Sequence, residues 1–235
     1  MFCALSAHAD AMGDALIFKT KVNDTAEVRR LIASGADVNA RDNFSKTALM
    51  WAASDNDSNI TKILIAAGAD VNARDNDGRT ALIHATWENA TDVARLLITA
   101  KADMNARDKD GRTALIHAAW NNTTDVAKLL IAAKADMNAK DKDGWTALMY
   151  AVGEKNSDIT KILIAAGADM NAKNNDGETA LINAAWENAT DVAKLLIAAG
   201  ANVNAKDNDD WTALDWAVER ENPDLVEALK AAGAR

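Results

Sequence analysis

The sequence predicts an all-α solenoid built from helix–turn–helix units that are joined by β-turn or hairpin loops. The main observation is a repeat, in which a threonine followed by Ala-Leu recurs every 33 residues. The six threonines are Thr47, Thr80, Thr113, Thr146, Thr179 and Thr212. The chain also contains only one proline, and this scarcity of proline favours helix. A unit of this length cannot bury its apolar face alone, so successive units must stack.

The first half of each unit reads as a turn followed by a short helix, and residues 75–107 illustrate this. Gly78 marks the turn, because glycine adopts a positive φ at no steric cost. Thr80 is a suitable N-cap for the apolar run behind it. We expect a helix from Ala81 to about Trp87.

The second half of the unit reads as an amphipathic helix. Asn89 separates it from the first helix, since asparagine tolerates the left-handed conformation. Thr91 or Asp92 is the expected N-cap, and a carboxylate at Asp92 suits the helix dipole. Apolar residues then follow with helical spacing. They are Val93, Leu96, Leu97 and Ala100.

This pattern resembles the ankyrin repeat, whose units read roughly D-x-x-G-x-T-P-L-H-x-A-A, then a second helix, then G-A-D-V-N-A. Here Asp141, Gly144 and Thr146 open one unit, and residues 167–172 (G-A-D-M-N-A) close it. The resemblance covers about residues 14–235 and implies an ankyrin-repeat solenoid. The proline of the family pattern is alanine in all six units.

The expected organisation is an array with a capping unit at each end. Lys19, Glu227 and Lys230 replace the residues that internal units carry at the same repeat positions. Charged replacements at the ends fit capping units, because terminal units need polar outer faces. A lead segment, an N-terminal cap and a C-terminal cap are expected at residues 1–13, 14–41 and 207–235. Five full repeats are expected over 42–206, at 42–74, 75–107, 108–140, 141–173 and 174–206.

Composition restricts the kinds of partner. A formal net charge of -9 argues against non-specific binding to nucleic acid or acidic membranes, and mildly favours a basic partner. A single cysteine, Cys3, fits a reducing compartment. We therefore expect a cytoplasmic monomer. Export, or a periplasmic location, is the alternative if residues 1–9 are the remnant of a signal peptide.

The resemblance implies a partner protein that docks on the concave side, which the turns and first helices form. All seven tryptophans of the chain fall at variable positions there, and Trp and Arg are favoured in binding hot spots. The alternative is that these tryptophans pack between neighbouring first helices. The expected partner-binding residues are Trp51, Arg79, His84, Trp87, Glu88, Arg112, His117, Trp120, Trp145, Tyr150, Trp186, Glu187 and Trp211.

Two charged columns also follow the repeat. A column of basic residues from Arg41 to Lys206 runs beside a column of carboxylates from Asp77 to Asp209. The two columns either neutralise each other on exposed turns or form a charged strip that steers a partner. His84 and His117 recur in neighbouring units, but stacked helices lie about 8–10 Å apart, too far for one metal ion. We expect no metal, no cofactor and no catalytic residue, since no phosphate loop or catalytic pairing is present.

These observations predict a non-enzymatic protein–protein interaction module, such as a regulator, inhibitor, adaptor or effector. The alternative is a structural or engineered scaffold with no native partner. Residues 75–107 and 108–140 differ at only seven positions, which suggests recent duplication or design. The absence of the Thr-Pro-Leu-His motif favours a natural origin, and uneven side chains at the variable positions favour a binding surface.

Overall fold

The computed structural model describes the backbone of residues 2–235 and the side chains of residues 11–235, and its regular elements over this range are helices. Contacts divide the chain into two compact units, residues 1–109 and 110–235. The first unit contains α1 (Phe2–Lys21), α2 (Thr25–Ala33), α3 (Ala48–Ser54), α4 (Ser58–Ala66), α5 (Ala81–His84) and α6 (Thr91–Thr99). The second contains α7 (Ala114–Trp120), α8 (Thr124–Ala132), α9 (Ala147–Gly153), α10 (Ser157–Ala165), α11 (Ala180–Trp186), α12 (Thr190–Ala198), α13 (Ala213–Glu219) and α14 (Pro223–Ala231).

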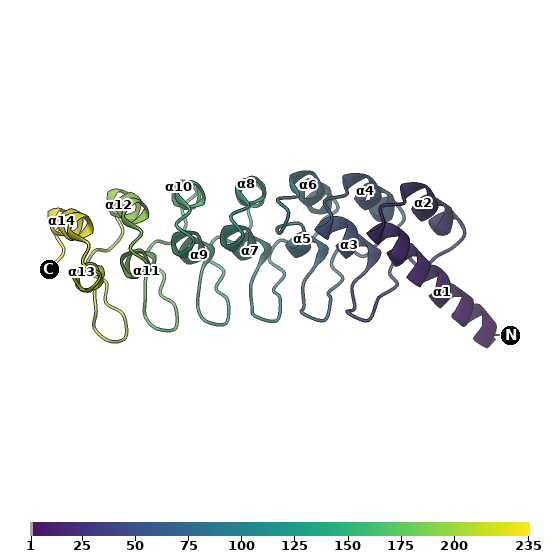
Figure 1. The fold of residues 1–235 in the computed structure, drawn as a ribbon, viewed down its shortest axis with the longest axis horizontal. Coiled ribbons are helices and arrows are strands. Elements are labelled where there is room, and N and C mark those ends of the chain that lie inside the picture. The colour runs from purple at the N-terminus through teal and green to yellow at the C-terminus, as the bar shows by residue number, and fades with distance from the viewer. Residues whose placement is uncertain (1) are drawn as a thin grey trace. The chain divides into compact units, whose positions relative to one another are not determined.

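Each unit has two layers of helices, with the turns on one side (Figure 1). In the first unit α1, α3 and α5 form one layer and α2, α4 and α6 the other. In the second unit the odd-numbered helices from α7 to α13 pack side by side, as do the even-numbered helices from α8 to α14. From α3 onward each pair of helices lies within one 33-residue period, and residues 13 and 14 both lie inside α1.

The core lies between the two layers and is aliphatic. The leucine after each Thr-Ala is buried in the five internal units, as with Leu82 at 0% exposure. Leu97 and its equivalents bury the facing side of the second helices. Each fully buried leucine contributes about 1.5–3 kcal/mol, so the repeated Leu and Ala positions stabilise the stack.

Side chains at the turns join neighbouring repeats. The Asn39 side-chain oxygen accepts a hydrogen bond from the Asp70 N–H at 2.8 Å, and Asn138 does the same for Asp169 at 2.9 Å. The basic column also forms cross-links: Arg41 Nη1 donates to the Arg74 carbonyl at 2.6 Å, and lysines do so later. The basic column therefore bonds mainly to backbone carbonyls, rather than to the carboxylates beside it.

Most of the local expectations for residues 75–107 are confirmed, with two corrections. Thr80 caps α5 by accepting from the Ile83 N–H, and Gly78 and Asn89 have positive φ. The expectation that the first helix reaches Trp87 is wrong, because α5 ends at His84.

The second correction concerns the start of α6. Its N-cap is Ala90, which makes no side-chain capping bond, so neither Thr91 nor Asp92 caps this helix. Thr91 instead begins the helix, and its hydroxyl donates to the Asn89 carbonyl at 3.2 Å. The expectation for Asp92 in the first turn is confirmed.

The N-terminal helix packs closely on the first turn region. A Cβ added at Gly13 would lie 2.4 Å from the Cβ of Ala40, so the absence of a side chain allows this approach. The side chains of residues 1–9, the possible remnant of a signal peptide, lie outside the described residues. Among the helices of residues 2–235, none is long and apolar enough to cross a membrane.

Candidate functional surface

Eleven of the thirteen expected binding residues come from three columns on the side that the first helices and turns form, and Glu88 and Glu187 directly follow the third column. We name the three columns by their place in the repeat. The turn column precedes the capping threonine and contains Lys46, Arg79, Arg112, Trp145, Glu178 and Trp211. The anchor column lies on the first helix and contains Trp51, His84, His117, Tyr150, Asn183 and Trp216. The helix-end column contains Ser54, Trp87, Trp120, Gly153, Trp186 and Glu219.

The anchor column holds the turns in place. In the second complete repeat, Asp75 Oδ1 accepts the N–H groups of Asp77 and Arg79 at 2.9 and 2.8 Å. Its other oxygen lies 2.9 Å from Nε2 of His84. Trp51, Tyr150 and Trp216 donate in the same way to Asp42, Asp141 and Asp207, at 2.9, 2.7 and 3.1 Å. Trp51, His84, Tyr150 and Trp216 thus share one function, which is to donate to a turn carboxylate, whereas in the repeat of Asn183 the turn residue is Asn174.

His84 is fully buried, and burial favours its neutral form. Burial lowers its pKa, an effect that the hydrogen bond to Asp75 opposes. Nε2–H donates to Asp75, and Nδ1 lies 3.2 Å from the Ser54 hydroxyl, so one neutral tautomer satisfies both contacts. His84 and His117 are 0% and 2% exposed, so both side chains are buried, and the expectation that they contact a partner stays a prediction.

Tyr150 and Trp51 are half-buried and also serve the turns. Burial, followed by the hydrogen bond to Asp141, raises the pKa of Tyr150 to about 12. Its hydroxyl also accepts from Nε of Arg112 at 3.2 Å. Both side chains leave part of a ring exposed, but their polar atoms are already bonded within the chain.

Three tryptophans of the helix-end column are the exposed ones. Trp87 is 36% exposed, and Trp120 and Trp186 are each 41% exposed. Trp145 and Trp211, in the turn column, are half-buried against Tyr150 and Trp216, with ring centroids 5.4 and 4.5 Å apart. These five indoles therefore combine packing within the chain with surface that a partner can contact.

Cations of this surface lie over the aromatic rings. Arg112 lies 4.5 Å from the ring centroid of Trp120, and Arg220 lies 3.7 Å from that of Trp186. In the first unit Arg79 lies 5.3 Å from the ring of Trp87. Such contacts orient the rings and contribute about 0.5–1 kcal/mol each at exposed sites. Glu88 is exposed and Glu187 is half-buried beside these tryptophans.

Sequence reasoning missed two exposed aromatic residues. Phe44 is 64% exposed at the tip of its turn, where later repeats carry Asp77 and its equivalents. Phe18, at 59%, stands on α1 in register with Trp51. The replacement of a carboxylate by phenylalanine at the tip of the turn is the sequence signal that could have identified Phe44.

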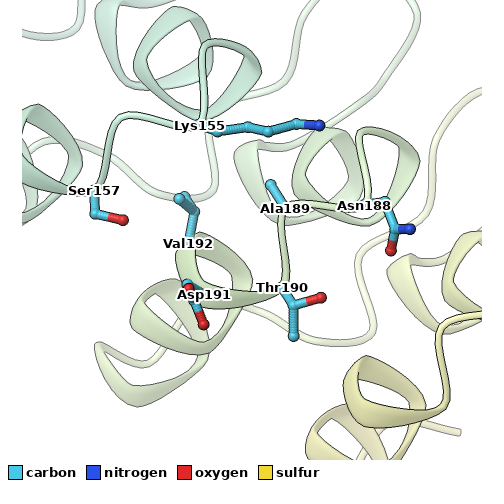
Figure 2. A pocket seen from close by; sticks show the side chains of 7 residues that line it. All are labelled: Lys155, Ser157, Asn188, Ala189, Thr190, Asp191 and Val192. Carbon is cyan, nitrogen blue, oxygen red and sulfur yellow. The ribbon is translucent and has the colours of Figure 1, made fainter.

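A hollow of about 270 Å³ in the second unit has a structural origin (Figure 2). Lys155, Ser157, Ala189 and Val192 are among its lining residues. One repeat later the position of Ala189 is Asn222, whose amide donates to Asn188 and Thr190 and whose oxygen caps α14. Alanine supplies neither contact, so the hollow is the space that a capping side chain fills elsewhere.

The comparisons with known proteins agree with this geometry. The family model described as ankyrin repeats (3 copies) matches residues 16–108, 98–174 and 153–235. A similar solved structure is the ankyrin repeat domain of Bcl-3, whose title calls it a unique member of the IkappaB protein family. It is 26% identical, with a TM-score of 0.84, and the match covers 92% of this chain and 97% of that one. No curated protein matches the sequence.

Proposed function

Because the chain belongs to the ankyrin-repeat family, whose domains generally mediate protein–protein interactions, we propose that it binds another protein through the exposed indoles of Trp87 in the first unit and of Trp120 and Trp186 in the second. The observation that carries this proposal is the exposure of these three indoles at one repeat position, beside alanines that are fully buried. Large exposed aromatic side chains at equivalent positions favour an interface.

The role fits a non-enzymatic regulator, inhibitor, adaptor or effector. The fold is known as a non-enzymatic interaction module, and among the described residues no three His, Cys, Asp or Glu side chains gather as a metal site needs. We further propose that the protein acts as a cytoplasmic monomer. A structural array with no native partner is the competing function.

Affinity capture from source-cell lysate tests the proposal. One bait is the intact chain, and a second carries Trp87→Ala, Trp120→Ala and Trp186→Ala. A third, matched bait carries Lys62→Ala, Arg95→Ala and Lys128→Ala, which change exposed residues of the second helices. Circular dichroism checks that all three baits are folded.

A protein retained by the first and third baits and lost by the second supports the proposal. If the three captures are identical, the tryptophans serve packing alone. The structural array is then the better account of the chain.

A further inference from the structure

Three cations gather around two indole rings in the first unit. Lys21 Nζ lies 4.0 Å from the ring centroid of Trp51, and Lys46 Nζ lies 4.4 Å from the same ring. Lys46 also lies 5.6 Å from the ring of Trp87, with Arg79 on that ring at 5.3 Å. One small area of the turn side therefore carries three positive charges.

Three carboxylates of this area, those of Asp42, Asp75 and Asp77, are already engaged. Asp42 accepts from Lys21 at 3.2 Å and from the Trp51 N–H at 2.9 Å. Asp75 is bonded to His84, and Asp77 pairs with Nη1 of Arg79 at 2.9 Å. Asp55 also lies within electrostatic range of Lys46 but forms no ion pair with it, so among the described residues no carboxylate bonds to the third cation.

Lys46 is the cation that this arrangement leaves without an acceptor. Among the described residues none accepts a hydrogen bond from its Nζ, and its contacts there are the two rings. Burial lowers the pKa of Lys46, and the neighbouring Arg79 and Lys21 lower it further against the pull of Asp75 and Asp42. Arg79 Nε is a second buried donor with no acceptor among the described residues.

In the second unit, the cation at the repeat position of Lys46 has acceptors within its own chain. Arg112, two repeats after Lys46, lies 3.2 Å from an Asp110 oxygen and 3.7 Å from an Asp141 oxygen. It also donates to the Tyr150 hydroxyl. Asp110 corresponds to Phe44, so Lys46 lacks the tip carboxylate that pairs with Arg112.

Apolar side chains border the cations of the first unit. Phe18 and Lys21 are three residues apart on α1 and so lie on one side of that helix. Phe44 is in the same turn as Lys46, and both phenylalanines are more than half exposed. We name Phe18, Lys21, Phe44, Lys46, Arg79 and Trp87 the basic aromatic patch.

We propose that the basic aromatic patch binds an acidic segment of the partner protein, with an Asp or Glu carboxylate accepting from Lys46 and Arg79 and with apolar neighbours against Phe18, Phe44 and Trp87. This inference rests on the proposed function and adds the partner's chemistry. Most of the net charge of -9 belongs to residues 110–235, so the first unit is the part of the chain best suited to an anionic segment. Opposite charges at an interface set its orientation and specificity.

The test uses the full chain and three fluorescein-labelled synthetic peptides. They share one apolar sequence and carry Glu, Gln or Lys at the same positions. The Glu peptide is expected to bind, with an affinity that falls as salt is added. Lys46→Met is expected to weaken binding about tenfold, and Lys46→Arg to retain it.

Lys62→Met is the control, since it removes the same charge from an exposed position on α4 in the same unit. Equal binding of the Gln or Lys peptide, or an unchanged affinity in Lys46→Met, overturns the inference. Capture of a partner that depends on the three tryptophans but tolerates Lys46→Met also overturns it, and leaves the proposed function standing. Failure of the proposed function itself appears as identical captures by the tryptophan and control baits.

Discussion

Residues 75–107 and 108–140 are nearly identical, but their first helices differ in length. The two repeats differ at seven positions, and both contain the run T-A-L-I-H-A. α5 nevertheless spans four residues, whereas α7 spans seven. The amides of Thr86 and Trp87 donate three residues back, to Ile83 and His84, while the Asn121 amide donates four residues back to His117.

We attribute the difference to one substitution. Thr86 stands where the next repeat has Ala119, and its buried hydroxyl donates to the Ile83 carbonyl at 2.7 Å. A threonine that bonds back to its own helix competes with the regular helical pattern. The aromatic contact at the surface also differs between the two repeats. The ring centroids of Trp87 and His84 lie 4.6 Å apart in an edge-to-face arrangement, whereas those of Trp120 and His117 lie 6.2 Å apart and are stacked.

The largest expected effect comes from removing the turn anchor, a feature shared with other repeats. Asp75→Ala removes the acceptor of two backbone N–H groups and of His84, and should lower the free energy of unfolding by about 3 kcal/mol. Urea denaturation measures it. The control Asp77→Ala breaks only an exposed ion pair and should cost less than about 0.5 kcal/mol. Equal losses would refute the anchoring role.

Exchanging the distinguishing residue tests the comparison itself. Ala119→Thr should shorten α7 and lower the free energy of unfolding by about 1–2 kcal/mol, because Ala119 is fully buried. Thr86→Ala should extend α5 towards Trp87. Hydrogen exchange at the amides of residues 86, 87, 119 and 120 reports both changes. Unchanged protection in either variant would assign the difference to another of the seven positions.

The pH dependence sharpens the same comparison at His84. Its pKa is lowered in the folded state, so below the unfolded value of about 6.5 the unfolded chain binds more protons. Stability contributed by neutral His84 should therefore be lost as pH falls below about 6.5. His84→Asn, which copies Asn183 of a later repeat, should weaken that dependence. Parallel curves of unfolding free energy against pH for both proteins would contradict this account.

The smallest expected effect concerns Lys101 and Lys134, where the two repeats agree. Both have positive φ, at 68° and 66°, in a position that is Gly68, Gly167 or Gly200 elsewhere. Lys101→Gly and Lys134→Gly should each raise the free energy of unfolding by about 1 kcal/mol and so raise the melting temperature. Scanning calorimetry measures the change. A lower melting temperature in either variant would rule out backbone strain at that lysine.

Much of the fold could be predicted because the determining residues act locally. A threonine before Ala-Leu caps a helix wherever it occurs, and most left-handed turns follow from Gly or Asn, although lysines and Ser45, Asp210 and Glu221 also adopt positive φ. The length of α5 could not be predicted, since the Thr86 hydroxyl forms its bond only once the helix has formed. Ala90 as N-cap was missed because the turn at Asn89, rather than a capping side chain, sets the start of α6.

The surface was harder to interpret than the fold. Variation at Trp51, His84 and Tyr150 resembles selection by a partner, but each of these side chains only has to donate to a turn carboxylate. Indole, imidazole and phenol all do so, and the sequence alone hides this equivalence. The exposed tryptophans were identified by their position at the end of the first helix, while Phe44 required the structure.

The most direct measurement is the ¹⁹F NMR spectrum of the chain labelled with 5-fluorotryptophan, with and without the captured partner protein. Single substitutions assign the seven resonances. The account predicts that Trp87, Trp120 and Trp186 shift on binding, and by more than Trp51 and Trp216, whose N–H groups are bonded to turn carboxylates. A bound partner that leaves the first three resonances unchanged would contradict it.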